Sequence, residues 1–336
     1  MDLVQSHLFR GEKPMIKINP QKMTRYIRGF RNKRVLVLGD LMMDKYIWGH
    51  VSRISPEAPI PVVEAKKDTS CLGGAGNVGH NLRTLGALPI LIGVVGRDKE
   101  GDWIRKTASD SRGIFVSKKR PTTVKTRVIA HHQHVVRVDL EEKTPISPQL
   151  EEKIHRFIRQ EKFDALIISD YNKGLITESL LRKILPFAEQ NKIPVCVDPK
   201  VEHFLSFSPI TLITPNHLEA EKLVHHDCRS DKEVEKAGES IFSNISTKYL
   251  ILKRGEQGLS VFEKGKKPIH VPTLAHEVYD VTGAGDTVIA VSSLALIAGA
   301  SIQEAAMLAN VAAGIVVGKL GTATLTADEL IAALKP

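Results

Sequence analysis

The chain has 336 residues, of which 42% are hydrophobic and 25% are charged, values that fit one large α/β domain or two smaller ones. The formal net charge is +9, but the basic residues are spread along the chain and only 5% of the residues are aromatic. This distribution favours attraction of phosphorylated small molecules over a nucleic-acid-binding surface.

Cysteine usage and the apolar runs exclude several other classes. Cys71, Cys196 and Cys228 are far apart and odd in number, so neither a disulfide framework nor a paired-cysteine zinc site is predicted. The apolar stretches at 288–300 and 305–318 contain polar residues or are too short to span a bilayer, and the N-terminus lacks a signal-peptide pattern. We therefore expect a protein of the reducing cytoplasm.

The chain is expected to begin with a loose tail over residues 1–20, then a helix from about Pro20 to Phe30. The strand that follows, Arg34-Val-Leu-Val-Leu-Gly-Asp40, ends in an acid. In parallel sheets, ligands gather at the carboxyl ends of the strands. Asp44 follows four residues after Asp40, so both carboxylates would lie near one rim and could hydrogen-bond sugar hydroxyls. The alternative is that Asp40 merely ends the strand.

Residues 45–67 and 121–139 differ from the rest because they hold short β-type runs, the first of them broken by prolines. We predict that the two segments pair as a small β-sheet lid. An apolar face on this lid would favour a homodimer formed through it. The alternative is a loop-like excursion that packs on its own domain.

A glycine-rich turn, Cys71-Leu-Gly-Gly-Ala-Gly-Asn-Val-Gly79, opens the next expected helix. It is superficially similar to a dinucleotide-binding fingerprint. However, it lies outside the first strand–turn–helix unit, and it follows Lys66-Lys-Asp-Thr69, which is not a smooth apolar strand. Asn77, among these small residues, could instead reach a polar ligand.

Further along, helices are expected from Glu100 to Arg112, near 148–160 and at 177–190, alternating with strands. Two of the strands end in acids, namely Asp170, which opens the loop Asp170-Tyr-Asn-Lys-Gly174, and Asp198 of Asp198-Pro-Lys200.

The strand Ile210-Thr-Leu-Ile-Thr-Pro-Asn216 runs into a helix from His217 to Val224. Asn216 and Glu219 are three residues apart on its first turn and face the same way. They could order a hydrated Mg²⁺ ion, which takes a few protein oxygens together with water and phosphate. A capping box is the alternative.

The stretch from Tyr249 to Phe262 is predicted to be a strand, a turn and a second strand. The turn carries Lys253 and Arg254, followed by Gly255 and Gly258. A basic turn of this kind would suit nucleotide phosphates, and a plain hairpin is the alternative.

The stretch Asp280-Val-Thr-Gly-Ala-Gly-Asp286 precedes a small and apolar run with the length of a buried helix. The glycine-rich turn is therefore predicted at a helix N-terminus, where free N–H groups and the helix dipole favour an anion. Asp286 could accept a proton from an attacking hydroxyl, and an anion cradle beside a base is what phosphoryl transfer to an alcohol requires. The alternative is that Asp286 caps the helix and the glycines only make a tight turn.

Together these motifs make the chain resemble the ribokinase-like (PfkB) family of sugar kinases, from about Lys33 to Leu334. The resemblance rests on Gly73-Gly-Ala-Gly-Asn-Val-Gly79 with Gly86, on Asp280–Asp286 and on Asn216-x-x-Glu219. It implies a single kinase domain over 1–336 with a three-layer α/β/α fold, a mostly parallel central sheet and a small β lid. It also implies ATP as the phosphoryl donor, with Mg²⁺, and a lid that excludes water on closure.

Within the family, four stretches look like those of the heptose phosphate kinases: Ser52-Arg-Ile-Ser-Pro-Glu-Ala-Pro-Ile-Pro-Val-Val63, Asp170–Gly174, Asp198–Lys200 and Val316-Val-Gly-Lys-Leu-Gly-Thr322. The implied reaction is ATP-dependent phosphorylation of the anomeric C1 hydroxyl of D-glycero-β-D-manno-heptose 7-phosphate, a step toward the ADP-heptose of lipopolysaccharide core. Many relatives carry a fused adenylyltransferase; this chain ends at Pro336, so a separate adenylyltransferase is expected. One departure is Asn172, where a smaller residue is expected. A kinase of the same fold for another sugar, sugar phosphate or nucleoside is the alternative.

The resemblance also implies roles by position. Asp286 would be the base, and the N–H groups of Gly283, Ala284 and Gly285 would hold the transferring phosphoryl group. The acceptor would be bound by Asp40, Asp44, Gly73, Gly74, Asn77, Arg137, Asp170 and Lys173, with Lys200 on its phosphate. The nucleotide would be bound by Asn216, Lys253, Gly255, Gly258, Gly283, Gly285 and Asn310. Asn216 and Glu219 would organise Mg²⁺ through water, and a monovalent cation such as K⁺ would lie near Asp280 and Thr282.

Overall fold

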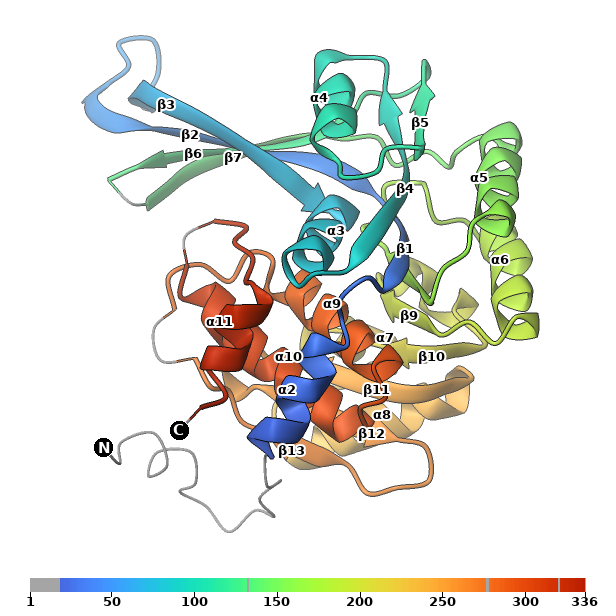
Figure 1. Ribbon diagram of the computed structural model, residues 1–336. Helices are drawn as coiled ribbons and strands as arrows, with labels where there is room; N and C mark the ends of the chain where they lie inside the picture. Colours follow the sequence, from blue (N-terminus) through green and yellow to red (C-terminus); the bar gives the residue numbers. More distant parts are fainter. Residues whose placement is uncertain (1–18, 132, 276–277, 320, 336) are drawn as a thin grey trace.

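The computed structural model describes residues 19–131, 133–275, 278–319 and 321–335, so most of the expected N-terminal tail lies outside the described residues. A central sheet carries helices on both faces, and a smaller sheet projects from one side of it (Figure 1). This confirms the predicted mostly parallel α/β fold with a second, smaller sheet.

The central sheet has nine strands within these ranges, in the order β13-β12-β11-β10-β9-β8-β1-β4-β5. The pairs from β10–β11 to β4–β5 are parallel, and only β11–β12 and β12–β13 are antiparallel. The strands are β1 (Arg34–Gly39), β4 (Leu88–Gly96), β5 (Gly113–Ser117), β8 (Ala165–Ser169), β9 (Val195–Asp198), β10 (Ile210–Ile213), β11 (Thr247–Lys253), β12 (Leu259–Glu263) and β13 (Ile269–Val271).

Helices cover both faces because the middle strands are apolar on both faces. The described helices are α2 (Pro20–Arg28), α3 (Ala75–Thr84), α4 (Lys99–Thr107), α5 (Pro148–Gln160), α6 (Glu178–Gln190), α7 (His217–Val224), α8 (Asp231–Asn244), α9 (Ala284–Ile297), α10 (Ile302–Val317) and α11 (Ala327–Ala332), with short 3₁₀ turns η1 (Val201–Ser206) and η2 (Gly255–Gln257).

Strand β1 shows how the two cores are divided. Val35 and Val37 belong to the core formed with α2, α3, α9 and α10, whereas Leu36 and Leu38 belong to the core formed with α5, α6 and α8. Successive side chains of a strand point to opposite faces, so this fully buried run serves both cores. No helix among the described residues is both long and apolar enough to cross a membrane.

The smaller sheet has the order β3-β2-β6-β7 and contains most of the residues of 45–67 and 121–139. Its strands are β2 (Leu41–Ile54), β3 (Pro61–Gly74), β6 (Thr123–Ala130) and β7 (Gln133–Leu140). Strand β3 runs through Lys66–Thr69, so this stretch is extended but, as the sequence indicates, it is not a smooth apolar strand. The side chains of this stretch are largely exposed, and an exposed ribbon tolerates charged residues that a buried strand would not.

Candidate active site

Four carboxylates lie at the carboxyl end of the central sheet. Asp40 follows β1, Asp170 follows β8, Asp198 ends β9, and Asp286 is in the first turn of α9. Their exposed fractions are only 4%, 1%, 8% and 4%, in that order. Buried acids gathered at this rim identify it as a candidate active site, because ligands of parallel sheets bind there.

Asp286 is held by two hydrogen bonds from distant parts of the chain. Its Oδ2 accepts from Asn77 Nδ2 and its Oδ1 accepts from the Tyr171 hydroxyl, each at 2.7 Å. Burial raises the pKa of Asp286 to about 7, with a further contribution from the nearby charge of Asp198, while the bond from Asn77 lowers it. A carboxylate with this pKa suits general-base chemistry near neutral pH. Asp286 is the third residue of α9 and Gly283 is the N-cap, so the alternative that Asp286 caps the helix was wrong.

The start of α9 brings bare backbone close to two polar side chains. Gly283 has φ +85°, and a Cβ placed on it would lie 2.8 Å from Asn77 Nδ2. A Cβ on Gly285 would lie 3.2 Å from Lys253 Nζ. Any larger side chain here would obstruct the helix N-terminus, so the glycines keep its positive dipole end accessible to an anion. The Ala284 N–H also donates to the Val281 carbonyl at 3.2 Å.

Asp40 does more than end its strand, because it anchors the loop after β8. Its carboxylate accepts from the backbone N–H groups of Tyr171 at 2.9 Å, Lys173 at 3.1 Å and Leu175 at 3.4 Å. Burial and the nearby Asp170 raise the pKa of Asp40 to about 6. The buried Asp40 carboxylate therefore holds the backbone of the loop that carries Tyr171.

Asp170 and Asn172 complete this loop. Asp170 accepts from Asn172 N and from His203 Nδ1, both at 2.8 Å, and the pKa of His203 is raised mainly by that hydrogen bond. Asn172 has φ +54°, a left-handed conformation that glycine adopts freely and that asparagine tolerates better than other residues. The backbone explains why a smaller residue was expected at this position.

Lys200 and Glu219 form an ion pair beside the same loop, and the Lys200 ammonium lies 5.6 Å from the centre of the Tyr171 ring. Glu219 also takes part in a capping box with Asn216: each side chain accepts from the other's backbone N–H at 2.9 Å. The capping box, which was the alternative to a Mg²⁺ site at Asn216 and Glu219, is thus present. The Glu219 carboxylate already has two partners, Lys200 and the Asn216 N–H.

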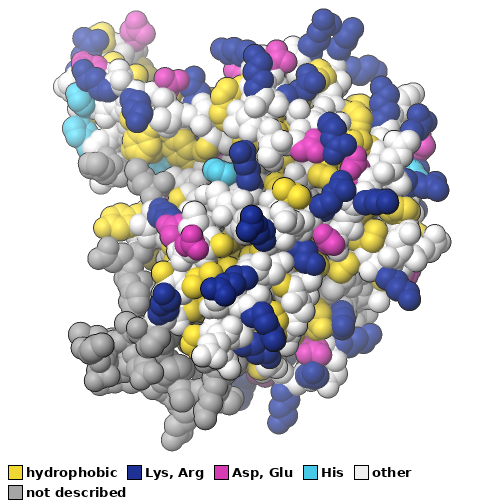
Figure 2. All heavy atoms as spheres, in the orientation of Figure 1, with side chains coloured by type: hydrophobic (Ala, Val, Ile, Leu, Met, Phe, Trp, Pro, Cys, Tyr) yellow, Lys and Arg dark blue, Asp and Glu magenta, His cyan; other side chains and the backbone are white. Residues whose placement is uncertain are grey.

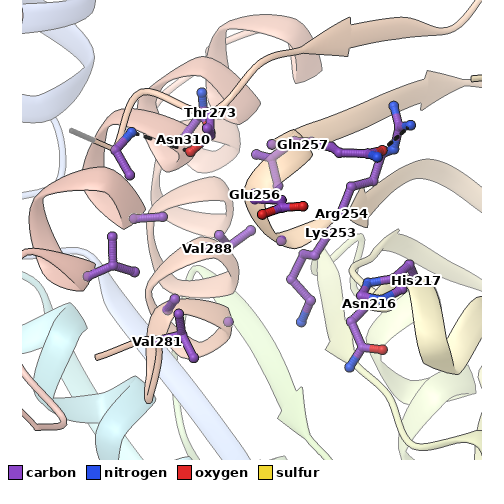
Figure 3. A pocket seen from close by; sticks show the side chains of 18 of the residues that line it. Asn216, His217, Lys253, Arg254, Glu256, Gln257, Thr273, Val281, Val288 and Asn310 are labelled. Atoms are coloured by element: carbon purple, nitrogen blue, oxygen red, sulfur yellow. Dashed lines mark hydrogen bonds between the residues drawn. The ribbon is translucent and has the colours of Figure 1, made fainter. Parts of the chain in front are cut away.

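A cavity of about 940 Å³ opens beside the α9 N-terminus, between the β11–β12 turn and α10 (Figure 3). Its lining includes the predicted nucleotide residues Asn216, Lys253, Gly255, Gly258, Gly285 and Asn310. Lys253 contacts the Asp198 carboxylate, and Asn310 donates to the Pro272 carbonyl at 2.7 Å. Gly283 faces Asn77 and is not part of this lining. The cavity has the size of a small-molecule site and touches the anion-binding end of α9.

On the other side of Asp286, the smaller sheet contributes a buried ion pair between Asp44 and Arg127. The Arg127 guanidinium lies 5.3 Å from the centre of the Tyr46 ring. Gly73 packs against Asp44 and Gly74 against the Asp40 carbonyl, with no room for a Cβ at either position. Asp44 is therefore charge-balanced and held in place by its neighbours.

Several predicted site residues are engaged elsewhere. Arg137 is exposed on β7 and pairs with Asp139 at 2.9 Å, and Lys173 pairs with Glu141 at 2.7 Å. The Asp280 carboxylate accepts a hydrogen bond from the backbone N–H of Thr282 at 2.9 Å, and this bond forms a local turn just before α9.

Three residues with prominent contacts were given no role by the sequence analysis: Tyr171, Asp198 and Arg127. Tyr171 and Asp198 belong to the stretches Asp170–Gly174 and Asp198–Lys200, which the sequence singles out after strands without a role for either residue. Arg127 is opposite Tyr46 in the parallel β2–β6 register, a pairing that no local pattern reveals.

A buried carboxylate beside an accessible helix N-terminus, with a ligand-sized cavity on one side, is an arrangement that suits phosphoryl transfer to an alcohol. Comparison with known proteins agrees. Residues 32–329 match the pfkB family of carbohydrate kinases, and the chain belongs to that family.

Among curated proteins, the bifunctional protein HldE of Geobacter metallireducens is 43% identical over 310 residues, which cover 90% of this chain and 63% of that protein. HldE of Geotalea uraniireducens is 43% identical over 308 residues, with the same coverage of 90% and 63%. The chain therefore spans less than two thirds of the length of these relatives.

Solved structures show the same fold. Arabidopsis thaliana ribokinase, complexed with ribose and ATP, has a TM-score of 0.71 at 21% identity and covers 90% of this chain and 99% of its own. Phosphofructokinase-2 from Escherichia coli, in complex with substrates and products, has a TM-score of 0.73 at 19% identity, with coverage of 90% and 98%.

Proposed function

We propose that the chain transfers the terminal phosphoryl group of ATP to the anomeric C1 hydroxyl of D-glycero-β-D-manno-heptose 7-phosphate, in the route to ADP-heptose. The observation that carries the proposal is the position of Asp286, between the anion-binding end of α9 and the Asn77–Tyr171 side of the rim. The likeness to the HldE proteins over 90% of the chain supports the choice of acceptor.

In this proposal the nucleotide lies in the cavity and its terminal phosphate at the start of α9. Asp286 takes the proton of the acceptor hydroxyl, whose oxygen forms the new bond to phosphorus as the bond to ADP breaks. The N–H groups of Gly283, Ala284 and Gly285, with the Lys253 ammonium nearby, stabilise the negative charge of the transferring group.

Mg²⁺ would neutralise charge on the ATP phosphates. The residues present fit an ion that is held mainly by phosphate and water: Asn216 lines the cavity, and Glu219, hydrogen-bonded to Asn216 at the start of α7, would reach the ion through water. No cluster of three or more histidine, cysteine or acidic side chains suited to a metal occurs in the described part of the chain. For a monovalent cation such as K⁺, the oxygens of Asp280 and Thr282 are the candidates.

The acceptor would lie between Asp286 and the smaller sheet, whose strands we propose as the lid. Its hydroxyls would contact Asn77, Asp40, Asp44, Asp170 and the backbone at Gly73 and Gly74, and Lys200, Lys173 and Arg137 would supply positive charge for its phosphate. Lys200 is paired with Glu219 and so is not free to bind a phosphate. This observation favours the second candidate function, a kinase of the same fold for an uncharged sugar or nucleoside.

We further propose that the chain is a cytoplasmic homodimer joined through the lid. Val136, Val138 and Leu140 alternate along β7 and are 49%, 58% and 56% exposed, and the β6–β7 register places Val124 and Val128 on the same face. An apolar stripe of this kind is what a second copy would cover. Lys and Arg side chains are spread over the face seen in Figure 2, which does not favour a nucleic-acid partner.

The test is a panel of sugars, sugar phosphates and nucleosides with Mg-ATP, scored for ADP release and for the phosphorylated product. We expect the heptose 7-phosphate to give the highest kcat/KM, with release of one ADP per 1,7-bisphosphate formed. A higher kcat/KM for an unphosphorylated sugar or nucleoside would favour the second candidate, and no acceptor-dependent ADP release with any compound would contradict both.

A further inference from the structure

The side chain of Tyr171 lies at the centre of the rim, although neither the motifs nor the comparisons assign it a role. Its hydroxyl donates to Asp286 Oδ1 at 2.7 Å, and the Lys200 ammonium lies 5.6 Å from the centre of its ring. Its backbone N–H donates to Asp40 at 2.9 Å. The backbone of Tyr171 is therefore held by Asp40, while its hydroxyl reaches Asp286.

We propose that Tyr171 is a positioning residue, whose hydroxyl, together with the Asn77 amide, fixes the plane of the Asp286 carboxylate and stabilises its ionised form. A carboxylate oxygen has two lone pairs, so one bond to each oxygen leaves a lone pair on each for the acceptor hydroxyl. The inference rests on the proposed function, because it concerns the base of that reaction.

The charges around Asp286 make such support necessary. Asp198, at the end of β9, repels a charge on Asp286, while Lys253, at the end of β11, attracts it. Around Tyr171 itself lie Lys200, Asp198 and Asp44, and burial first and then the charge of Asp286 raise the pKa of Tyr171 well above its usual 10. The phenol therefore keeps its proton and donates a hydrogen bond to Asp286 throughout the working pH range.

The first test is the pH dependence of kcat/KM for Tyr171→Phe, which removes one oxygen atom and keeps the ring. We expect the acid limb to move up by about one pH unit, because hydrogen bonds to charged groups are among the stronger ones. At a pH below the acid-limb pKa of both proteins, kcat/KM of the variant should be about 10-fold lower than that of wild type. KM for ATP should be unchanged. An acid limb that coincides with that of the wild type would overturn the proposal.

The chain offers a matched control in Tyr26, whose hydroxyl donates to Glu304 at 3.1 Å, between α2 and α10. Tyr26→Phe removes the same kind of bond far from the rim, so its pH profile should follow the wild type. In the Asp286→Asn background, Tyr171→Phe should leave the residual kcat unchanged, because Tyr171 acts through Asp286. A further large loss there would show that Tyr171 acts independently of Asp286.

A second readout does not depend on activity. Removing the Tyr171 bond should lower Tm more at pH 8, where Asp286 is ionised, than at pH 5, where it is protonated. Hydrogen bonds lower the pKa of Glu304, so Tyr26→Phe should lower Tm equally at both pH values. Equal losses at both pH values for Tyr171→Phe would overturn the proposal, whether or not any sugar is phosphorylated. Failure of the acceptor panel alone would contradict only the proposed function.

Discussion

Asp286 is placed where a charge is unfavourable for folding and useful for chemistry. It is buried, Asp198 is close by, and its pKa is raised to about 7. A side chain selected only for stability would not be ionisable here. Binding and catalytic sites commonly carry such costs, because a preorganised base must be kept ready before the acceptor arrives.

The first prediction concerns the stability of Asp286→Asn as a function of pH. Because the folded-state pKa is raised from 3.8 to about 7, the folded chain holds this proton more tightly than the unfolded chain. The free energy of unfolding therefore falls as pH rises from about 4 to about 7, and the cost is complete above pH 7. Asparagine cannot ionise, so Tm of the variant should exceed that of wild type by several degrees at pH 8 and by less at pH 5.

A control of opposite sign is available in Asp98, which accepts from Gly101 N and Thr122 N, both at 2.8 Å. The pKa of Asp98 is lowered because its hydrogen bonds outweigh its burial, so its ionised form stabilises the fold. Asp98→Asn should lower Tm at pH 8. A lower Tm for Asp286→Asn at pH 8, with a difference that does not change toward pH 5, would contradict the account.

At the scale of elements, much of the structure could be predicted from local signals. The helix from His217 to Val224 has the expected bounds, because Asn216 and Glu219 cap it reciprocally. The helix expected to reach Arg112 ends instead at Thr107. Ala108 is extended, and Asp110 accepts from the Arg112 backbone, which stabilises a turn. Propensity extends a helix further than tertiary structure allows when no glycine or proline marks its end.

The contacts of the site could not be predicted in the same way. The bond from Asn77 to Asp286 joins residues 209 positions apart, and the bond from Tyr171 joins residues 115 positions apart. Glycine-rich turns and strand-end acids have signatures within a few residues, so those were found. Which side chains meet across the rim depends on strand order, and strand order is a property of the whole sheet.

The second prediction concerns Lys200, which precedes η1 and pairs with Glu219 of α7. Lys200→Ala should raise KM for a phosphorylated sugar about 10-fold or more and leave KM for unphosphorylated analogues unchanged, because charge-assisted bonds to phosphate are strong. Steady-state kinetics with both classes of acceptor measures this. An equal effect on both classes would argue against a phosphate contact.

Lys22 provides the matched control for this variant. It pairs at 2.6 Å with Glu304, which is the capping-box glutamate of α10, just as Lys200 pairs with the capping-box glutamate of α7. Lys22→Ala removes the same arrangement from another helix, so KM for every acceptor should stay at the wild-type value.

At the scale of the whole molecule, two cores share one sheet, and the smaller sheet extends away from both (Figure 1). The smaller sheet keeps an apolar stripe on β7 exposed, whereas β1 at the centre is buried on both faces. From this contrast we expect the proposed lid to be freer to move or to associate than the rim.

The third prediction tests that association. Val138→Asp places a charge in the exposed stripe, so the molar mass in light scattering should fall from that of a dimer to that of a monomer. Leu205, on η1, is also exposed, and Leu205→Asp should leave the molar mass unchanged. A wild-type chain that is already monomeric at working concentrations would contradict the proposed dimer.

The central claim is that Asp286 is the base of a sugar-phosphoryl transfer, and the most direct measurement is the turnover of Asp286→Asn beside that of wild type. With Mg-ATP and the heptose 7-phosphate, kcat should fall by about 100-fold or more, because general-base catalysis is worth that much, while ATP binding measured by calorimetry changes little. Near-normal turnover in the variant, with the same product formed, would contradict the account.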